Sequence, residues 1–205
     1  MMHNVTHIYK GLAPSFSSCI GPLFEFINLV DILPKPLEGV MGYIVNSLGS
    51  LDLDGEKGKP LQNHPFFPES DQNCVVDKLI NILDKATSVY PAEELEVRAS
   101  SLLTAILIIH KMAPDGPRKH IESLLLPEKD DRSQPIGKSD TLPSRLLRLY
   151  TGPYPTLKQV IKELMFNMSD NDPETLMRNI GFGFASGMLL SNNAEIPTTA
   201  SGAFS

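Results

Sequence analysis

Apolar side chains recur along this chain with the period of an α-helix. Twice they fall at positions i, i+3, i+4, i+7, i+8 and i+11, first from Leu37 to Leu48 and again from Leu157 to Met168. On a helix these positions form one continuous apolar stripe, which packs against neighbouring elements. No stretch of the sequence shows the strict alternation that is typical of a half-buried strand. The pattern therefore predicts an all-α protein.

Prolines and glycines divide the apolar stretches into separate helices, because proline interrupts helical hydrogen bonding and disfavours the helical region for the residue before it. We expect helices at 1–10, as the tail of a longer helix, and at 20–33, 36–49, 74–90, 93–113 and 118–126. Four more are expected: one that ends before Gly152, one at 157–168, one that opens with Pro173 behind the N-cap Asp172, and one at 184–190.

Two segments stand apart from these amphipathic helices. The centre of the 93–113 helix, Leu102–Ile109, is apolar on every side, which a helix tolerates only when neighbours cover all its faces. The segment 52–73 is rich in Asp, Gly, Lys and Pro, so we expect a long loop held to the core by Phe66 and Phe67. The first should be the most buried helix, and the second should carry no chemistry.

Helix pairs that follow one another with prolines between them are typical of armadillo/HEAT-like α-solenoids. We therefore expect residues 1–190 to form one helical repeat region of stacked helix pairs. Residues 191–205 show no helical period and are expected to form a flexible tail. The predicted fold class is thus an all-α solenoid.

Composition and charge argue against several classes of function, among them nucleic-acid binding. The chain has 205 residues, of which 41% are hydrophobic, and a formal net charge of −6 at pH 7. It offers no broad basic field of the kind that drives nucleic-acid binding. Its longest apolar run is far shorter than the roughly 18 residues needed to span a bilayer, and the N-terminus has no signal pattern. We expect a cytoplasmic protein with no nucleic-acid partner and no transmembrane segment, in which Cys19 and Cys74 are reduced.

The residues that could take part in catalysis or metal binding form no known active-site or metal-binding motif. Gly181, Gly183 and Gly187 have the spacing G-x-G-x-x-x-G with no predicted strand before them, so a helix break is favoured over a phosphate loop. His3 and His7 have the i, i+4 spacing of two metal ligands but lack the intervening acid of a metalloprotease helix. We expect no enzymatic activity, no cofactor, no metal and no small-molecule substrate.

Several stretches resemble one known family. The sequences LLLPEKDDRSQPIGKSDTLPSRLLRLYT and IKELMFNMSDNDPETLMRNIGFGFASGMLLSNN resemble the C-terminal half of fungal synembryns. The sequences VDKLINILDKATSVYPAEELE and APDGPRKHIESLLLPE resemble that family as well, so the resemblance covers the chain from about Val5 to Asn193. Synembryns are cytosolic chaperones and guanine nucleotide exchange factors for the α subunits (Gα) of heterotrimeric G proteins.

The resemblance implies a function without bond chemistry. A synembryn binds nascent or nucleotide-free Gα and holds the Gα C-terminal helix in the concave face of its solenoid. This chain would then be a chaperone and a non-enzymatic exchange factor, recruited to the cell cortex through Gα. Synembryns have further repeats before the matched region and an acidic segment after it, so we expect a fragment of a longer solenoid whose end helices expose apolar faces. The alternative is a helical-repeat scaffold that binds another protein or peptide without exchange activity.

The resemblance also selects a candidate binding site. In a synembryn, basic residues of the helix that matches RLLRLYT lie near the bound carboxyl end of Gα, which points to Arg145 and Arg148. These two residues are three apart and hence neighbours on one helix face, and a guanidinium can grip a carboxylate with two parallel hydrogen bonds. From the residues alone, a solvated surface is the other interpretation. We expect two lysines of the next helix to extend the patch, and a Phe–Asn pair to line the groove. The predicted protein-binding residues are Arg145, Arg148, Lys158, Lys162, Phe166 and Asn167.

Overall fold

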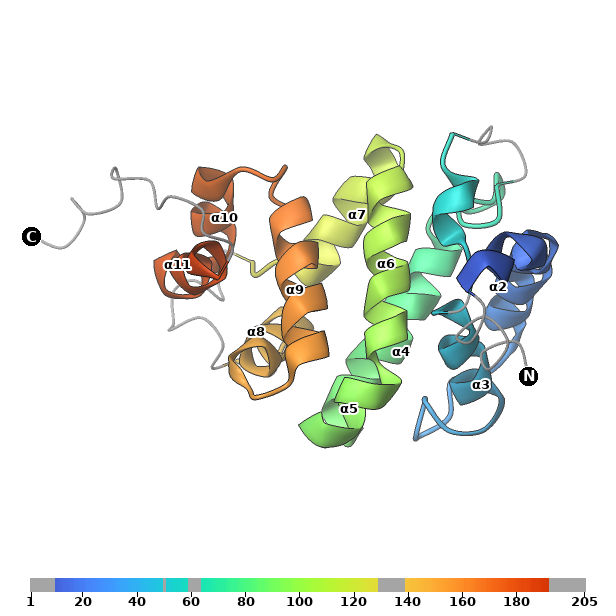
Figure 1. The fold of residues 1–205 in the computed structure, drawn as a ribbon, viewed down its shortest axis with the longest axis horizontal. Coiled ribbons are helices and arrows are strands. Elements are labelled where there is room, and N and C mark those ends of the chain that lie inside the picture. Colours follow the sequence, from blue (N-terminus) through green and yellow to red (C-terminus); the bar gives the residue numbers. More distant parts are fainter. Residues whose placement is uncertain (1–9, 50, 59–63, 129–138, 192–205) are drawn as a thin grey trace, which may run out of the picture.

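A computed structural model describes residues 10–49, 51–58, 64–128 and 139–191 of the chain, and every element within them is a helix (Figure 1). The predicted all-α class is therefore confirmed. The elements are η1 (Lys10–Cys19), α2 (Ile20–Leu29), α3 (Gly39–Leu48), η2 (Leu53–Glu56), α4 (Cys74–Val89), α5 (Ala92–Arg98), α6 (Ser100–Met112), α7 (Asp115–Leu125), α8 (Leu142–Thr151), α9 (Pro155–Asn167), α10 (Pro173–Ile180) and α11 (Phe182–Leu190).

The helices stack in two layers, as in an α-solenoid. Helix α6 contacts α3 on one side and α9 on the other, and these three stand side by side in Figure 1. Behind them, α4 contacts α2 on one side and α8 on the other. Contacts of α4 with α6 and of α8 with α9 join the layers. Each helix therefore buries its apolar stripe mainly against its immediate neighbours, which is the packing expected of stacked helix pairs.

The segment that was expected to be most buried is two helices rather than one. Helices α5 and α6 meet at Ala99, where φ is −99° and ψ is −13°. Within α6, all side chains of Leu102–Ile109 are buried except Thr104 and Ile108. The segment contains neither Pro nor Gly, but Ser100 and Ser101 follow Ala99 directly, and the Ser100 hydroxyl donates a hydrogen bond to the Glu96 carbonyl at 2.7 Å, a contact that tends to bend helices. In the bent arrangement Glu96 of α5 also accepts hydrogen bonds from the start of α9.

Helices α2 and α3 are shorter than the expected helices 20–33 and 36–49. Helix α3 begins only at Gly39, whose φ of +60° interrupts the right-handed path of the chain. Just before it, the N–H of Leu37 donates a hydrogen bond to the hydroxyl of Tyr90 at 3.2 Å. A contact across the fold thus fixes backbone that the local pattern assigned to a helix.

The loop after α3 is held to the core as predicted. The side chains of Phe66 and Phe67 are buried, and the ring of Phe66 meets that of Phe24 in α2 edge-on, with 4.7 Å between the centroids. One short 3-10 helix, η2, lies within this segment and was not expected.

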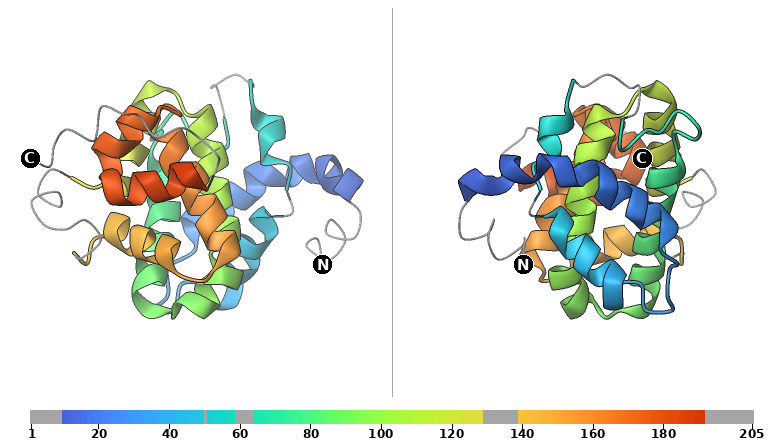
Figure 2. Two further views of the ribbon diagram at one scale, coloured as in Figure 1. Left: turned by 60° about the vertical axis from the view of Figure 1, so that its left-hand side comes forward. Right: turned by 90° about the vertical axis from the view of Figure 1, so that its right-hand side faces the viewer.

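Both ends of the described stack expose large apolar side chains, in agreement with the expectation from the sequence. At one end, which faces the viewer in the right-hand view of Figure 2, these side chains belong to α2, α3 and the segment between them. They are Phe26, Leu29, Leu33, Val40 and Tyr43. At the other end, Phe182 and Leu190 of α11 are exposed. Among the residues that the structure describes, no further helix covers these faces.

Three expectations concern residues outside those that the structure describes: the first helix at 1–9, the tail at 192–205, and the pair His3 and His7. In the described part of the chain, no helix combines the length and the apolar character that crossing a membrane requires.

Candidate functional site

Helix α8 presents the two predicted arginines toward α4 and α5. Pro143 lies in its first turn, where the missing N–H leaves no hydrogen bond unmade. The apolar residues of α8 are buried against its neighbours, which fixes the rotation of the helix. Arg145 and Arg148, one turn apart, then line the same hollow next to the end of α4 and the start of α5.

Arg145 is a buried clamp between α4 and α8. Only 8% of the residue is exposed. Its Nε donates to Thr87 Oγ1 at 3.0 Å, and its Nη2 donates to the carboxylate of Asp84 and, at 3.3 Å, to the Asp84 backbone carbonyl. Its Nη1 donates to the backbone carbonyl of Asp140 and lies 3.3 Å from Asp140 Oδ1. The interpretation of this residue as part of a solvated face is therefore wrong.

Arg148 is far more accessible. Its side chain is 44% exposed. Its Nη1 donates to the Ser139 carbonyl at 2.7 Å, and its Nη2 lies 3.6 Å from Asp140 Oδ1. Both arginines therefore reach the short segment that leads into α8, but Arg148 retains a large surface toward solvent.

The two arginines line a hollow of about 230 Å³ between α4, α5 and α8. Its other walls are Thr87, Tyr90, Ala92, Leu95, Leu149 and Tyr154. Both arginines therefore border one hollow, together with aromatic and aliphatic side chains. A basic group flanked by apolar surface suits the end of a peptide, which has a carboxylate and apolar side chains.

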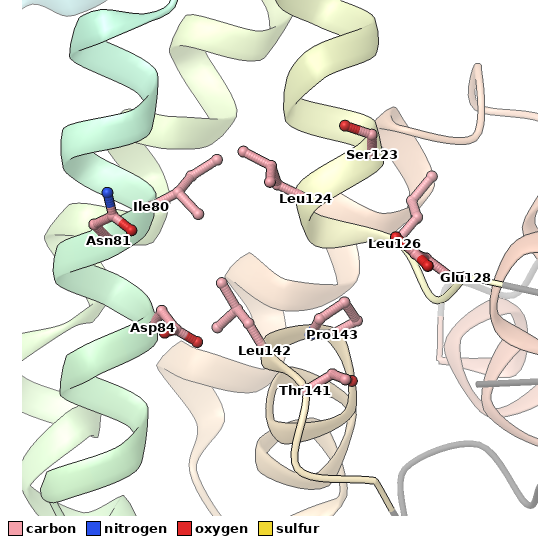
Figure 3. A pocket seen from close by; sticks show the side chains of 10 residues that line it. All are labelled: Ile80, Asn81, Asp84, Ser123, Leu124, Leu126, Glu128, Thr141, Leu142 and Pro143. Carbon is pink, nitrogen blue, oxygen red and sulfur yellow. The ribbon is translucent and has the colours of Figure 1, made fainter. Parts of the chain in front are cut away.

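A second, larger cavity lies beyond the Asp84–Arg145 pair. It has a volume of about 560 Å³ and opens between α4, the end of α7 and the start of α8 (Figure 3). Its apolar walls are Ile80, Leu124, Leu126, Leu142 and Pro143, and its polar walls are Asn81, Asp84, Ser123, Glu128 and Thr141. Asp84 therefore borders this cavity while it holds Arg145, which lines the smaller hollow.

The predicted residues of α9 lie in other surroundings. Lys158 is exposed, and its Nζ lies 5.5 Å from the centre of the Tyr150 ring, within the range of a cation–π contact. Lys162 is buried with 8% exposure. Phe166 is half-buried against the core, and Asn167 Oδ1 lies 2.8 Å from Nδ1 of the buried His110 in α6. The structure thus brings together the two arginines but not all six residues.

His110 and His120 tie α7 to its neighbours. Nε2 of His110 lies 3.1 Å from Glu122 Oε1 in α7, and Nε2 of His120 in α7 lies 2.6 Å from Asp77 Oδ1 in α4. Within the described residues, no group of three or more His, Cys, Asp and Glu side chains could hold a metal ion. These histidines therefore serve the packing of the helices.

The glycine-rich segment is a helix break, as predicted. Gly181 has a φ of +79° and separates α10 from α11, whereas Gly183 lies inside α11 and interrupts nothing. Asp172 caps α10 by accepting a hydrogen bond from the Thr175 N–H at 2.7 Å.

Sequence reasoning missed the partners that decide how accessible each arginine is. Asp84 and Thr87 are three apart on the polar side of α4, so they share a face just as Arg145 and Arg148 do. Only Asp84 of these two carries a charge, so their spacing alone does not identify Arg145, 61 positions away on another helix, as the partner. The tyrosines at the mouth of the hollow, Tyr90 and Tyr154, stand before Pro91 and Pro155 and carry no comparable signal.

Acidic residues near the hollow partly neutralise the positive charge of its two arginines. Desolvation raises the pKa of the Tyr154 hydroxyl, and its hydrogen bond to Glu93 and the negative charges of Glu93 and Glu96 raise it further. Tyr154 is therefore neutral at physiological pH. With Asp84 and Asp140 beside the arginines, the hollow is a balanced site rather than a strongly cationic one.

Comparison with known proteins gives one family. A comparison with curated proteins found no match. The family of the guanine nucleotide exchange factor synembryn, Ric8, matches residues 1–204, which is nearly the whole chain. The all-helical stack agrees with the resemblance noted in the sequence. This chain belongs to the Ric8 (synembryn) family of guanine nucleotide exchange factors.

Proposed function

We propose that this chain binds Gα subunits, assists their folding and promotes GDP release by holding the Gα C-terminal helix. The observation that supports this most directly is the hollow in which α8 places Arg148 beside Tyr90, Leu149 and Tyr154. Its half-exposed guanidinium can bind the terminal carboxylate of Gα, and the apolar walls can receive the side chains that precede it. In this proposal the chain works in the cytoplasm and reaches the cell cortex through Gα.

Each predicted residue receives a different role. Arg148 makes the first contact with the carboxylate because its side chain is 44% exposed. Arg145 lies behind it and contributes after exchanging one of its present acceptors. Lys158 extends the binding surface along α9, since it is exposed. Lys162, Phe166 and Asn167 lie outside this hollow, so in this proposal they contact parts of the Gα helix farther from its carboxyl end.

Exchange in this proposal requires no bond chemistry. Gα with its C-terminal helix withdrawn is a minor conformer with a loosened nucleotide site. A protein that binds this conformer preferentially raises its population, and GDP leaves from it. The surface therefore acts by binding, and no catalytic residue is needed.

The test uses a peptide of the Gα C-terminus with either a free or an amidated carboxyl end. Arg148→Glu should weaken binding of the free-acid peptide by at least tenfold, because a charge-assisted hydrogen bond contributes about 1.5 to 3 kcal/mol. Amidation should weaken binding to the unaltered chain by at least a similar factor, and it should weaken binding to Arg148→Glu by less, since the contact with Arg148 is already lost there.

A matched control is Arg178→Glu on α10, which makes the same charge change at an exposed arginine whose side chain bonds Thr175. This variant should bind the peptide as the unaltered chain does. Additive effects of amidation and Arg148→Glu would place the carboxylate elsewhere. GDP release from purified Gα, with and without the chain, separates an exchange factor from a scaffold that only binds.

A further inference from the structure

The guanidinium of Arg145 has no donor left for a ligand. A guanidinium carries five N–H groups. Five oxygen contacts surround this one, from Thr87 Oγ1 and from the side-chain and backbone oxygens of Asp84 and Asp140. A ligand carboxylate can bind Arg145 only by replacing one of these acceptors.

The acceptors differ in how strongly they hold Arg145, and the carboxylate that holds it most closely is the main competitor of a ligand carboxylate. Backbone carbonyls are fixed by the chain, and the Asp140 carboxylate makes only a long contact of 3.3 Å from a side chain that is 91% exposed. The Asp84 carboxylate makes the closest ionic contact, and its side chain is 52% exposed. Replacing this carboxylate by another one preserves the charge balance around the buried arginine, which a neutral ligand would not do.

The cavity beyond the pair provides space for the displaced side chain. Asp84 borders the 560 Å³ cavity, and Figure 3 shows it on α4 across from Leu142 of α8 and from Thr141, which precedes α8. Rotation of the Asp84 side chain can therefore free one donor position of Arg145 without a change of backbone, while the contacts with Thr87, Asp140 and the Asp84 carbonyl remain. The smaller hollow, on the other side of the pair, remains available for the ligand.

We propose that Asp84 is a built-in competitor: its carboxylate occupies Arg145 in the unbound chain, and the terminal carboxylate of the bound peptide takes its place. This inference rests on the proposed function, since it assumes that a peptide carboxylate enters the hollow. It adds a regulatory step to that function, because the chain engages Arg145 fully only with a ligand that can replace an aspartate.

The competition has a direct consequence for affinity. If the binding-competent state is only a fraction of the population, the apparent dissociation constant is larger than the intrinsic one by the inverse of that fraction. Asp84→Asn keeps the size of the side chain but removes its charge. It should therefore tighten binding of the free-acid peptide by about tenfold, while the amidated peptide gains little.

The matched control is Asp77→Asn, which makes the same charge change two turns earlier on α4 at a residue that contacts His120 instead of Arg145. It should leave peptide affinity unchanged. Equal gains for both variants would mean that the general charge of α4, and not competition at Arg145, sets the affinity, and this would overturn the proposal.

A second measurement uses the unaltered chain, so it stands even if Asp84→Asn fails to fold. The side-chain carboxyl ¹³C resonance of Asp84 should shift when the free-acid peptide binds and stay in place with the amidated peptide. A chain that binds the free acid better than the amide, with no shift at Asp84 and no gain in Asp84→Asn, would contradict the inference but keep the proposed function. A chain that does not distinguish the two peptides would contradict both.

Discussion

At Arg145 a positive charge lies inside the protein and is compensated by two carboxylates from different parts of the chain. Thr87 and Asp84 of α4 bind it from one helix, and Asp140 binds it from the segment before α8. Arg148, one turn later, interacts with the same segment but is largely in water. Arg145 and Arg148 have the same side chain and lie three positions apart on one helix, but their structural roles differ.

This difference predicts unequal effects on stability. Arg145→Ala leaves an uncompensated carboxylate and unfilled acceptors at the α4–α8 contact, so it should lower the free energy of unfolding by about 2 to 3 kcal/mol. This loss is smaller than the loss expected on breaking a fully buried ion pair, because the Asp84 side chain is half exposed. Arg148→Ala should cost under about 1 kcal/mol. Urea unfolding followed by circular dichroism measures both, and equal losses would contradict the assignment of Arg145 as a clamp.

At the scale of elements, one carboxylate joins α5 to α9. Glu96 accepts hydrogen bonds from the backbone N–H groups of Thr156 and Leu157, each at 2.9 Å, and thus caps the first turn of α9 from another helix. Burial alone would raise the pKa of Glu96, but these hydrogen bonds and one from the Thr156 hydroxyl outweigh it, so the pKa is lowered from 4.5. The bend between α5 and α6 places Glu96 where it can make this cap.

The cap predicts a pH-dependent contribution to stability. Because the folded state lowers the pKa of Glu96, its stabilisation is fully present above the ordinary value of 4.5 and is lost as pH falls through the lowered value. Glu96→Gln should cost about 1 to 2 kcal/mol at pH 7 and flatten the loss of stability below about pH 4.5. Unfolding curves from pH 7 to pH 3 measure this. Glu163→Gln, an exposed glutamate on α9, is the control and should change little.

The sequence predicted a helix well where its apolar residues followed the helical period and a capping residue or a glycine marked its end. The stripe of α9, the N-cap Asp172 and the break at Gly181 are all local signals, and each lies where it was expected. The apolar period did not reveal the α5–α6 bend, where two adjacent serines are the local signal, or the start of α3, before which Leu37 is bonded to the distant Tyr90. The burial of Arg145 was also missed, because its partner Asp84 lies on another helix.

At the scale of the whole molecule, the described stack has a covered centre and exposes large apolar side chains at both of its ends. Helix α6 has neighbours on both sides and in the second layer, whereas α2, α3 and α11 expose large apolar side chains. In a repeat protein each unit is stabilised mainly by its neighbours. The end helices should therefore open more readily than the centre.

Native-state hydrogen exchange tests this difference. Backbone amides of α6 should exchange most slowly, at a rate set by global unfolding, and amides of α2, α3 and α11 should exchange at least tenfold faster through local opening. Uniform protection along the described helices would show that the chain unfolds as one cooperative unit and that its ends are not weakly held.

The central claim is that the chain binds Gα through the Gα carboxyl end at α8. The most direct measurement compares its affinity for intact nucleotide-free Gα and for Gα that lacks its last few residues. We predict at least tenfold weaker binding of the shortened Gα, and a much smaller difference when the chain carries Arg148→Glu. Equal binding of intact and shortened Gα to the unaltered chain would contradict the account.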